Sequence, residues 1–210
     1  MIPKILLQIS KEKPDLHNLK LIEKYFSGYT YNHFTDDEII DFFIKNPLDE
    51  FPNCIELFNR IPIGAWKADF FRYYYLYLNG GVFLDSDAMI HCHIDNIIDQ
   101  YSGIFIKSNY FYERGLDFTH IFNGFICITA KSPIIYECLK HIYNIDFTII
   151  KNYQVFCIEM LKNILRVDIS NIQIFEEKVI QNEGKSVVYD KDKIILSHYF
   201  QNKKIPIEHI

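Results

Sequence analysis

Residues 64–87 constrain the fold of this chain most, because a helix pattern, an Asn-Gly-Gly stop and a short apolar strand follow one another directly. Aromatic side chains recur at helical spacing through residues 64–78, which predicts a helix with one aromatic face in the core. The glycines can adopt positive φ and end that helix. The apolar residues 82–84 then predict a buried strand whose carboxyl end carries Asp85 and Asp87.

Strand and helix patterns alternate through the first part of the chain. Residues 2–9 read as a buried strand, a helix follows Pro14, and residues 29–34 read as a second strand before a helix start at Thr35. Such alternation predicts an α/β fold with a mostly parallel central sheet flanked by helices. Later patterns predict a strand at 121–129, helices at 133–141 and 153–165, strand-like runs at 172–175, 186–189 and 194–196, and a polar tail that includes His198. The length of 210 residues suits one domain with a full core.

Composition excludes several classes of function. The net charge of -5 argues against nucleic acid as a partner, because no basic stripe is present to displace counterions from phosphates. The N-terminal apolar run is too short for a signal peptide or a transmembrane segment. Five cysteines, none spaced as C-x-x-C, read as reduced core thiols. We therefore expect a cytoplasmic protein.

The aspartate pair suits a divalent cation. In an extended segment the side chains of Asp85 and Asp87 project to one side, with Cα atoms roughly 6.5 Å apart, and their oxygen ligands suit Mg²⁺ or Mn²⁺. Burial and mutual repulsion would make a cation favourable there. The same spacing recurs at Asp190 and Asp192, but among lysines in a polar turn. The alternative for Asp85 is a turn or helix cap.

An acid and a base share one face of the predicted helix. Asp69 and Arg72 lie beside Ala65 and Ala68, whose small side chains would let a ligand approach closely. A structural ion pair is the alternative interpretation of the two charged residues. Trp66 belongs to the aromatic face, which favours a role in the core over one in ligand binding.

Three segments carry a resemblance to a known family. Residues 65–87, written AWKADFFRYYYLYLNGGVFLDSD, resemble the signature of glycosyltransferase family 32, whose members are DXD-containing sugar transferases. Residues 2–9 are similar to the opening strand of that family, and residues 122–125 are similar to its asparagine-bearing strand. The resemblance covers about the first 140 residues and only loosely the remainder.

The resemblance implies a GT-A-like, Rossmann-like single domain over residues 1–210. The nucleotide-sugar half would comprise about residues 1–100, and the acceptor half and tail about residues 101–210. It implies retaining transfer of a hexose from a UDP- or GDP-linked donor to a glycan or a protein- or lipid-linked acceptor. The implied cofactor is Mn²⁺ or Mg²⁺.

The resemblance also implies roles for individual residues. Asp87 would ligate the metal, Asp85 would contact the donor ribose and the metal, and Asp69 with Arg72 would hold the transferred sugar and the ribose. The remaining expected contacts are those of Gln8, Ile9 and Ser10 with the base, of Asn123 and Gly124 with the sugar, and of His198 with the metal or diphosphate.

Departures from the family pattern keep other functions open. Leu7, Ser10 and Phe83 stand where the family commonly carries His, Trp and Tyr, which leaves a non-catalytic nucleotide-sugar-binding relative as an alternative. A phosphatase with an Asp-x-Asp motif is a further alternative. In phosphatases of that kind, however, the motif normally lies near the start of the domain, whereas here it begins at Asp85. Retention of Asp69 and Arg72 favours the transferase.

Overall fold

The computed structural model describes residues 1–14, 16–109, 119–150, 154–168 and 170–199. Within them, one sheet has the strand order β2-β1-β3-β6-β5-β7-β8-β9-β4. The strands are β1 (Ile5–Ile9), β2 (Thr30–Phe34), β3 (Gly81–Leu84), β4 (Ala88–Ile90), β5 (Gly103–Ser108), β6 (His120–Ile128), β7 (Ile172–Ile180), β8 (Lys185–Asp190) and β9 (Lys193–Tyr199). The helices are α1 (Leu16–Tyr25), α2 (Asp36–Lys45), α3 (Cys54–Arg60), α4 (Gly64–Asn79), α5 (Asp95–Ile98), α6 (Pro133–Asn144) and α7 (Val155–Arg166), with a 3₁₀ turn η2 (Gln181–Glu183).

The sheet is mixed, so the expected mostly parallel character is wrong. β1 is parallel to β2 and β3, and β5 is parallel to β7. The other neighbouring strands are antiparallel, because β6 returns between β3 and β5 and the strands from β7 to β9 follow one another through short turns. The α/β class, with helices flanking one central sheet, is confirmed.

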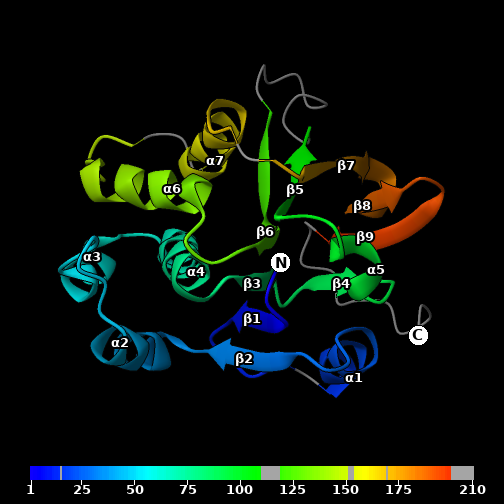
Figure 1. Cartoon of the computed structure of the whole chain (residues 1–210), viewed down its shortest axis with the longest axis horizontal. Helices are drawn as coiled ribbons and strands as arrows, with labels where there is room; N and C mark the ends of the chain where they lie inside the picture. Colours follow the sequence, from blue (N-terminus) through cyan, green and yellow to red (C-terminus); the bar gives the residue numbers. More distant parts are fainter. Residues whose placement is uncertain (15, 110–118, 151–153, 169, 200–210) are drawn as a thin grey trace.

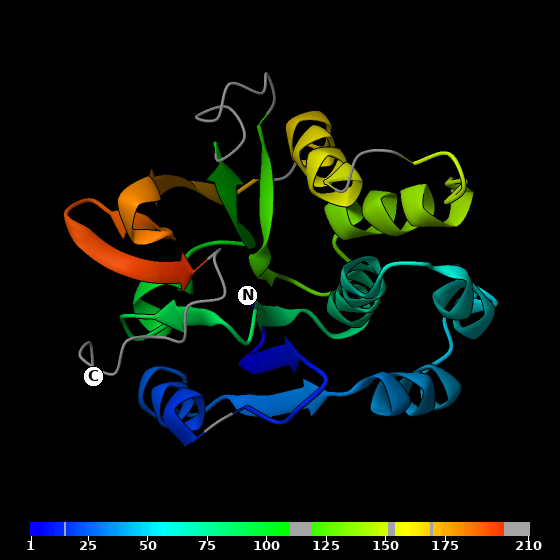
Figure 2. The ribbon, with the colours of Figure 1, turned by 180° about the vertical axis from the view of Figure 1, so that it is seen from behind.

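Two cores lie on opposite faces of the central strands (Figures 1 and 2). On one face, α2, α3, α4, α6 and α7 pack an aromatic-rich core, in which Trp66 is 3% exposed and its ring lies 5.7 Å from that of Phe156. The expected core role of Trp66 is therefore confirmed. On the other face, α1 and α5 pack with β4, β8 and β9, which curl away from the central strands.

Helix α4 and strand β3 meet at two glycines that set the position of the strand. Gly80 follows the last residue of α4 with φ of 66°, and Gly81 begins β3 with φ of 109°. A Cβ on Gly81 would lie 2.7 Å from the carbonyl oxygen of Ile5, so glycine permits the close approach of β3 to β1. The predicted helix, stop and strand are confirmed within one residue at each end.

Several features after β3 differ from the sequence-based expectations. The short strand β4, the one-turn helix α5 and strand β5 have no counterpart among the predicted elements. His198, expected in a polar tail, lies in strand β9, opposite Ala88 of β4. All five cysteines are free thiols. Within the described ranges, no helix combines the length and the apolar character needed to cross a lipid bilayer.

Candidate active site

An irregularity in β6 brings the Asp-Ser-Asp turn next to residues 122–124. The register of β6 against β5 shifts between Phe105 and Lys107, while Leu84 at the end of β3 still pairs with Phe125. The amide of Asp85 then donates to the carbonyl oxygen of Gly124 at 2.8 Å. The carboxyl end of β3 and the irregular part of β6 therefore lie side by side, joined by this backbone hydrogen bond.

The backbone of the aspartate turn is held from three sides. The amide of Ala88 donates to the carbonyl oxygen of Asp85 at 3.1 Å, which closes the turn between β3 and β4. From α1, Nδ2 of Asn18 donates to the carbonyl oxygen of Ser86 at 2.9 Å. From β1, Nε2 of Gln8 lies 3.5 Å from the carbonyl oxygen of Asp85. None of these three contacts uses a carboxylate of the motif.

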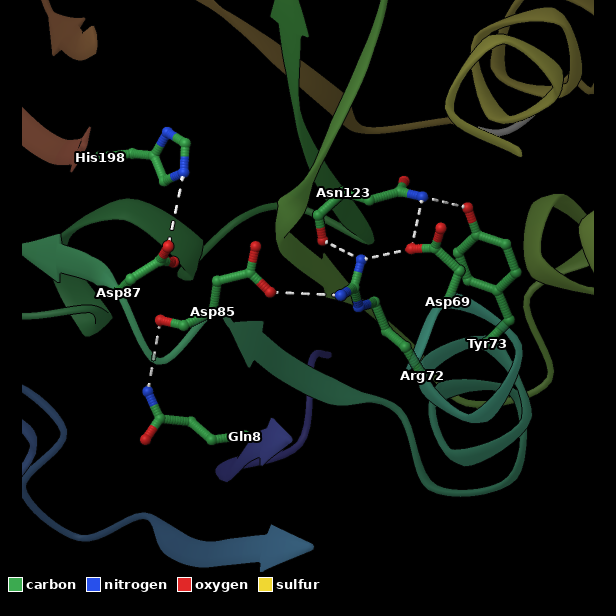
Figure 3. A network of polar contacts seen from close by, with 8 residues as sticks. All are labelled: Gln8, Asp69, Arg72, Tyr73, Asp85, Asp87, Asn123 and His198. Carbon is green, nitrogen blue, oxygen red and sulfur yellow. Dashed lines mark hydrogen bonds and ion pairs between the residues drawn. The ribbon is translucent and has the colours of Figure 1, made fainter. Parts of the chain in front are cut away.

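Arg72 joins the helix to the aspartate turn (Figure 3). Its Nη1 donates to Oδ1 of Asp69 at 2.8 Å and to the carbonyl oxygen of Asn123 at 2.7 Å, and its Nη2 donates to Oδ1 of Asp85 at 3.2 Å. The expected pair of Asp69 and Arg72 is thus formed, and the guanidinium extends it to Asp85. Charge-assisted bonds of this kind fix geometry as well as contributing energy.

Asp69 is an almost fully buried carboxylate within this network. Its Oδ1 accepts a second bond from Nδ2 of Asn123 at 3.0 Å, and the same amide contacts the hydroxyl of Tyr73 at 2.7 Å. Burial raises the pKa of Asp69 to about 6, against the opposing effects of Arg72 and the bond from Asn123. Asp69 is therefore mainly ionised at neutral pH but gains a proton more readily than an exposed aspartate.

Phe83, one of the departures from the family pattern, packs against Arg72. Its ring is fully buried, and Cζ of Arg72 lies 3.8 Å from the ring centroid. The guanidinium of Arg72 therefore stacks on the face of the Phe83 ring in a cation–π contact.

Asp87 and His198 face each other on the far side of the turn. Nε2 of His198 is 3.9 Å from Oδ2 of Asp87, too far for a hydrogen bond. Desolvation and the charge of Asp85 raise the pKa of Asp87, whereas His198 opposes that change. Two mutually repelling carboxylates with an imidazole nearby form a donor set that a hard divalent cation would stabilise.

The protein alone offers a cation only a partial set of ligands. In the described part of the chain, no group of three or more His, Cys, Asp and Glu side chains is gathered tightly enough to hold a metal. Cations such as Mg²⁺ commonly use one or two carboxylates and complete their coordination with substrate phosphates. Asp85 and Asp87 fit that pattern, with His198 beside them.

A cavity of about 690 Å³ unites most of the expected site residues. It is lined by Asp69, Arg72, Asp85, Asp87, Asn123, Gly124 and His198, and by the small residues Ala65 and Ala68. Gln8, Ile9 and Ser10 do not line it; Gln8 is 1% exposed and lies behind the aspartate turn. The structure therefore brings together the residues expected to bind sugar and metal, but not those expected to bind the base.

Several further cavity residues were not predicted as site residues, among them Ser108, His120, Cys157 and Glu177. For Glu177 a signal was present, because it alternates in phase with the apolar residues Phe175 and Val179 along β7. A charged residue on the buried phase of a strand is a candidate for a functional group. The others had no comparable signal.

The site can be compared with known proteins. Residues 14–104 match the model of a family described as the glycosyltransferase sugar-binding region containing the DXD motif. An uncharacterized glycosyltransferase of Acanthamoeba polyphaga mimivirus is 30% identical over 112 residues, which cover 53% of this chain and 42% of that protein. The initiation-specific α-1,6-mannosyltransferase of Saccharomyces cerevisiae is 38% identical over 72 residues, or 34% of this chain and 15% of that protein. The PaToxG glycosyltransferase structure is similar with a TM-score of 0.49 and 15% identity, covering 78% of this chain and 70% of that chain.

The family match includes the aspartate motif of the cavity. The matched region of the family contains Asp69, Arg72 and the Asp85–Asp87 turn. The matched stretches span less than half of either curated relative. The α/β architecture, with the motif at the carboxyl end of β3, agrees with the GT-A-like fold implied by the resemblance. Residues 14–104 of this chain are therefore similar to the sugar-binding region of DXD-containing glycosyltransferases.

Proposed function

We propose that this chain is a metal-dependent, retaining hexosyltransferase that uses a UDP- or GDP-linked sugar and a glycan or another hydroxyl acceptor. The observation that carries the proposal is the position of Arg72, whose guanidinium binds Asp69 and Asp85 at one wall of the cavity. About residues 1–100 would form the nucleotide-sugar half of one domain, and about residues 101–210 the acceptor half and tail.

Asp85 and Asp87 would hold Mn²⁺ or Mg²⁺ together with the donor diphosphate, and His198 would contact the metal or the diphosphate. When bound, the cation supplies the positive charge that stabilises the departing nucleoside diphosphate. Asp87 lines the cavity with 64% of its side chain exposed, so its carboxylate is accessible to a cation, which supports this assignment. The base-binding role of Gln8, Ile9 and Ser10 stays a prediction, and Gln8 also supports the backbone of the aspartate turn.

Asp69 would hold the transferred sugar. Both described bonds to its carboxylate, from Arg72 and Asn123, end on Oδ1, so Oδ2 can accept a bond from a sugar hydroxyl. Arg72 and Asn123 fix the orientation of the carboxylate, and a nearby negative charge favours the positive charge that develops on the sugar ring. Ala65 and Ala68 leave room for the ring beside Asp69. Asn123 and Gly124 complete the predicted sugar contacts.

Thermal-shift measurements with UDP- and GDP-sugars, with and without Mn²⁺, test the proposal. We expect at least one donor to raise the melting temperature only when Mn²⁺ is present, because ligands that bind the native state stabilise it. Hydrolysis of that donor would separate an enzyme from a non-catalytic binder. NMR of the product anomer would test retention. If no donor raises the melting temperature in the presence of Mn²⁺, the proposal is wrong.

A further inference from the structure

Three polar residues lie in a row across β6, β5 and β7, in a part of the cavity that the donor roles leave unassigned. Ser108 pairs with His120 across β5 and β6. Lys107 pairs with Glu176 across β5 and β7, so the next position brings Ser108 beside Glu177. Directly opposed residues share one face of a sheet. Ser108, His120 and Glu177 accordingly all line the cavity, and their exposed fractions are 2%, 5% and 8%.

Glu177 is the charged member of this row. Among the described residues, it has neither a hydrogen-bond partner nor an ion-pair partner, although it is more than nine-tenths buried. Its neighbour Glu176 points to the opposite face of β7, where its side chain is 66% exposed and lies 3.4 Å from Nζ of Lys107. The oxygens of Glu177 are not among the buried polar atoms that lack a partner, so its carboxylate is open to the cavity, where ligand groups can donate hydrogen bonds to it.

The surroundings of Glu177 favour a neutral ligand that donates hydrogen bonds. Burial lowers the pKa of His120 to about 4, so its imidazole is uncharged at neutral pH and supplies no counterion. Arg72 is already engaged by Asp69, Asp85 and the carbonyl oxygen of Asn123. A phosphate near Glu177 would therefore meet uncompensated negative charge, whereas sugar hydroxyls would donate to it.

The position of Glu177 also fits a second sugar rather than the donor diphosphate. Glu177 pairs with Val188, Val188 with Leu196, and His198 lies two residues beyond Leu196 on the same face. Two strand spacings and two residues along β9 separate these positions, so the Cα atoms of Glu177 and His198 lie roughly 12 Å apart. One ring could therefore occupy the space near Glu177 while the diphosphate lies by Asp87.

We propose that Glu177 binds the hydroxyl groups of a pyranose acceptor, in a subsite whose wall includes Ser108 and His120. This inference rests on the function proposed above and names the substrate class for the other end of the same cavity. Glu177 acts here as a specificity-determining residue, because its carboxylate selects rings that present hydroxyl donors toward β7.

Saturation-transfer NMR with methyl α-glycosides of mannose, glucose and galactose tests the subsite without any donor. We expect wild-type protein to bind at least one glycoside, and Glu177→Gln to weaken that binding at least tenfold. The substitution keeps the shape of the side chain, so folding should be retained. Glu176→Gln is the matched control, since it removes the same charge one residue away on the opposite face, and it should bind like wild type.

The rise in melting temperature caused by Mn²⁺ and a nucleotide sugar separates this inference from the proposed function. We expect Glu177→Gln to keep that rise while it loses glycoside binding. Absence of binding for all three glycosides in wild type, or equal binding by the Glu177 and Glu176 variants, would overturn the subsite even if the donor still binds. Loss of the donor effect in wild type, with Glu177-dependent glycoside binding intact, would instead remove the proposed function.

Discussion

Nη2 of Arg72 lies 3.2 Å from Oδ1 of Asp85, so helix α4 is joined by an ion pair to the first carboxylate of the DXD motif. The same guanidinium binds Asp69 through Nη1 at 2.8 Å. The side chains of Arg72 and Asp69 are only 6% and 12% exposed, whereas that of Asp85 is 31% exposed. Arg72 therefore couples a buried acid of the core to a partly exposed acid of the cavity.

Arg72→Met should destabilise the fold, because it leaves Asp69 buried without its counterion. Breaking a buried ion pair on one side typically costs about 3–5 kcal/mol. Urea unfolding measures the decrease in the free energy of unfolding. The double variant Asp69→Asn with Arg72→Met should lose less than the sum of the two single variants, since no uncompensated charge remains. Additive losses would show that the two residues act independently.

The pH dependence of stability should reveal the burial of Asp69. Its pKa is raised to about 6, so the folded state holds the proton more tightly than the unfolded state. The stabilisation linked to that proton is present below the unfolded pKa and is lost as pH rises through about 6. A pKa that differs by one between the folded and unfolded states corresponds to about 1.4 kcal/mol. Unfolding of wild type and Asp69→Asn at pH 4 to 7 isolates this contribution. The free energy of unfolding of wild type minus that of Asp69→Asn should decrease from pH 4 to 6 and then level off. A difference that stays constant over this range would contradict the raised pKa of Asp69.

Gly124→Ala should damage the site more than the fold. An added Cβ would lie 2.5 Å from Oδ2 of Asp85 and 2.2 Å from the ring of Phe122, and both are ends of side chains that can move. Displacement of Asp85 should weaken Mn²⁺-dependent nucleotide binding at least tenfold, while stability falls by about 1 kcal/mol. Gly64→Ala is the control, because nothing lies within 4 Å of its added Cβ. Equal binding by the two variants would argue against a role for the Asp85 carboxylate.

The sequence predicted those parts of the fold that local patterns specify. The helix α4, its glycine stop and β3 follow from aromatic spacing and positive φ, and the start of α2 follows from the capping box of Thr35 and Glu38. Strand direction after β3 could not be predicted in this way. β4 has only three residues, and the place of β6 between β3 and β5 depends on long-range pairing that leaves no local pattern.

The candidate site was predictable where chemistry and motif coincide. Asp69, Arg72, Asp85 and Asp87 were named from spacing and resemblance, and the cavity contains all four. The bond from Arg72 to Asp85 required the α4–β3 geometry, and the contact with the carbonyl oxygen of Asn123 required the irregular register of β6. Ser108 and His120 became neighbours only through strand pairing.

Calorimetric titration of UDP and GDP, with and without Mn²⁺, tests the central claim most directly when wild type is compared with Asp87→Asn and Asp190→Asn. Asp190 is the matched control, because it belongs to the second Asp-x-Asp sequence at the end of β8, and it does not line the cavity. We predict Mn²⁺-dependent binding of one nucleotide by wild type and by Asp190→Asn, and at least tenfold weaker binding by Asp87→Asn. Binding that is independent of Mn²⁺, or equal in the two variants, would contradict a cation site at Asp85 and Asp87.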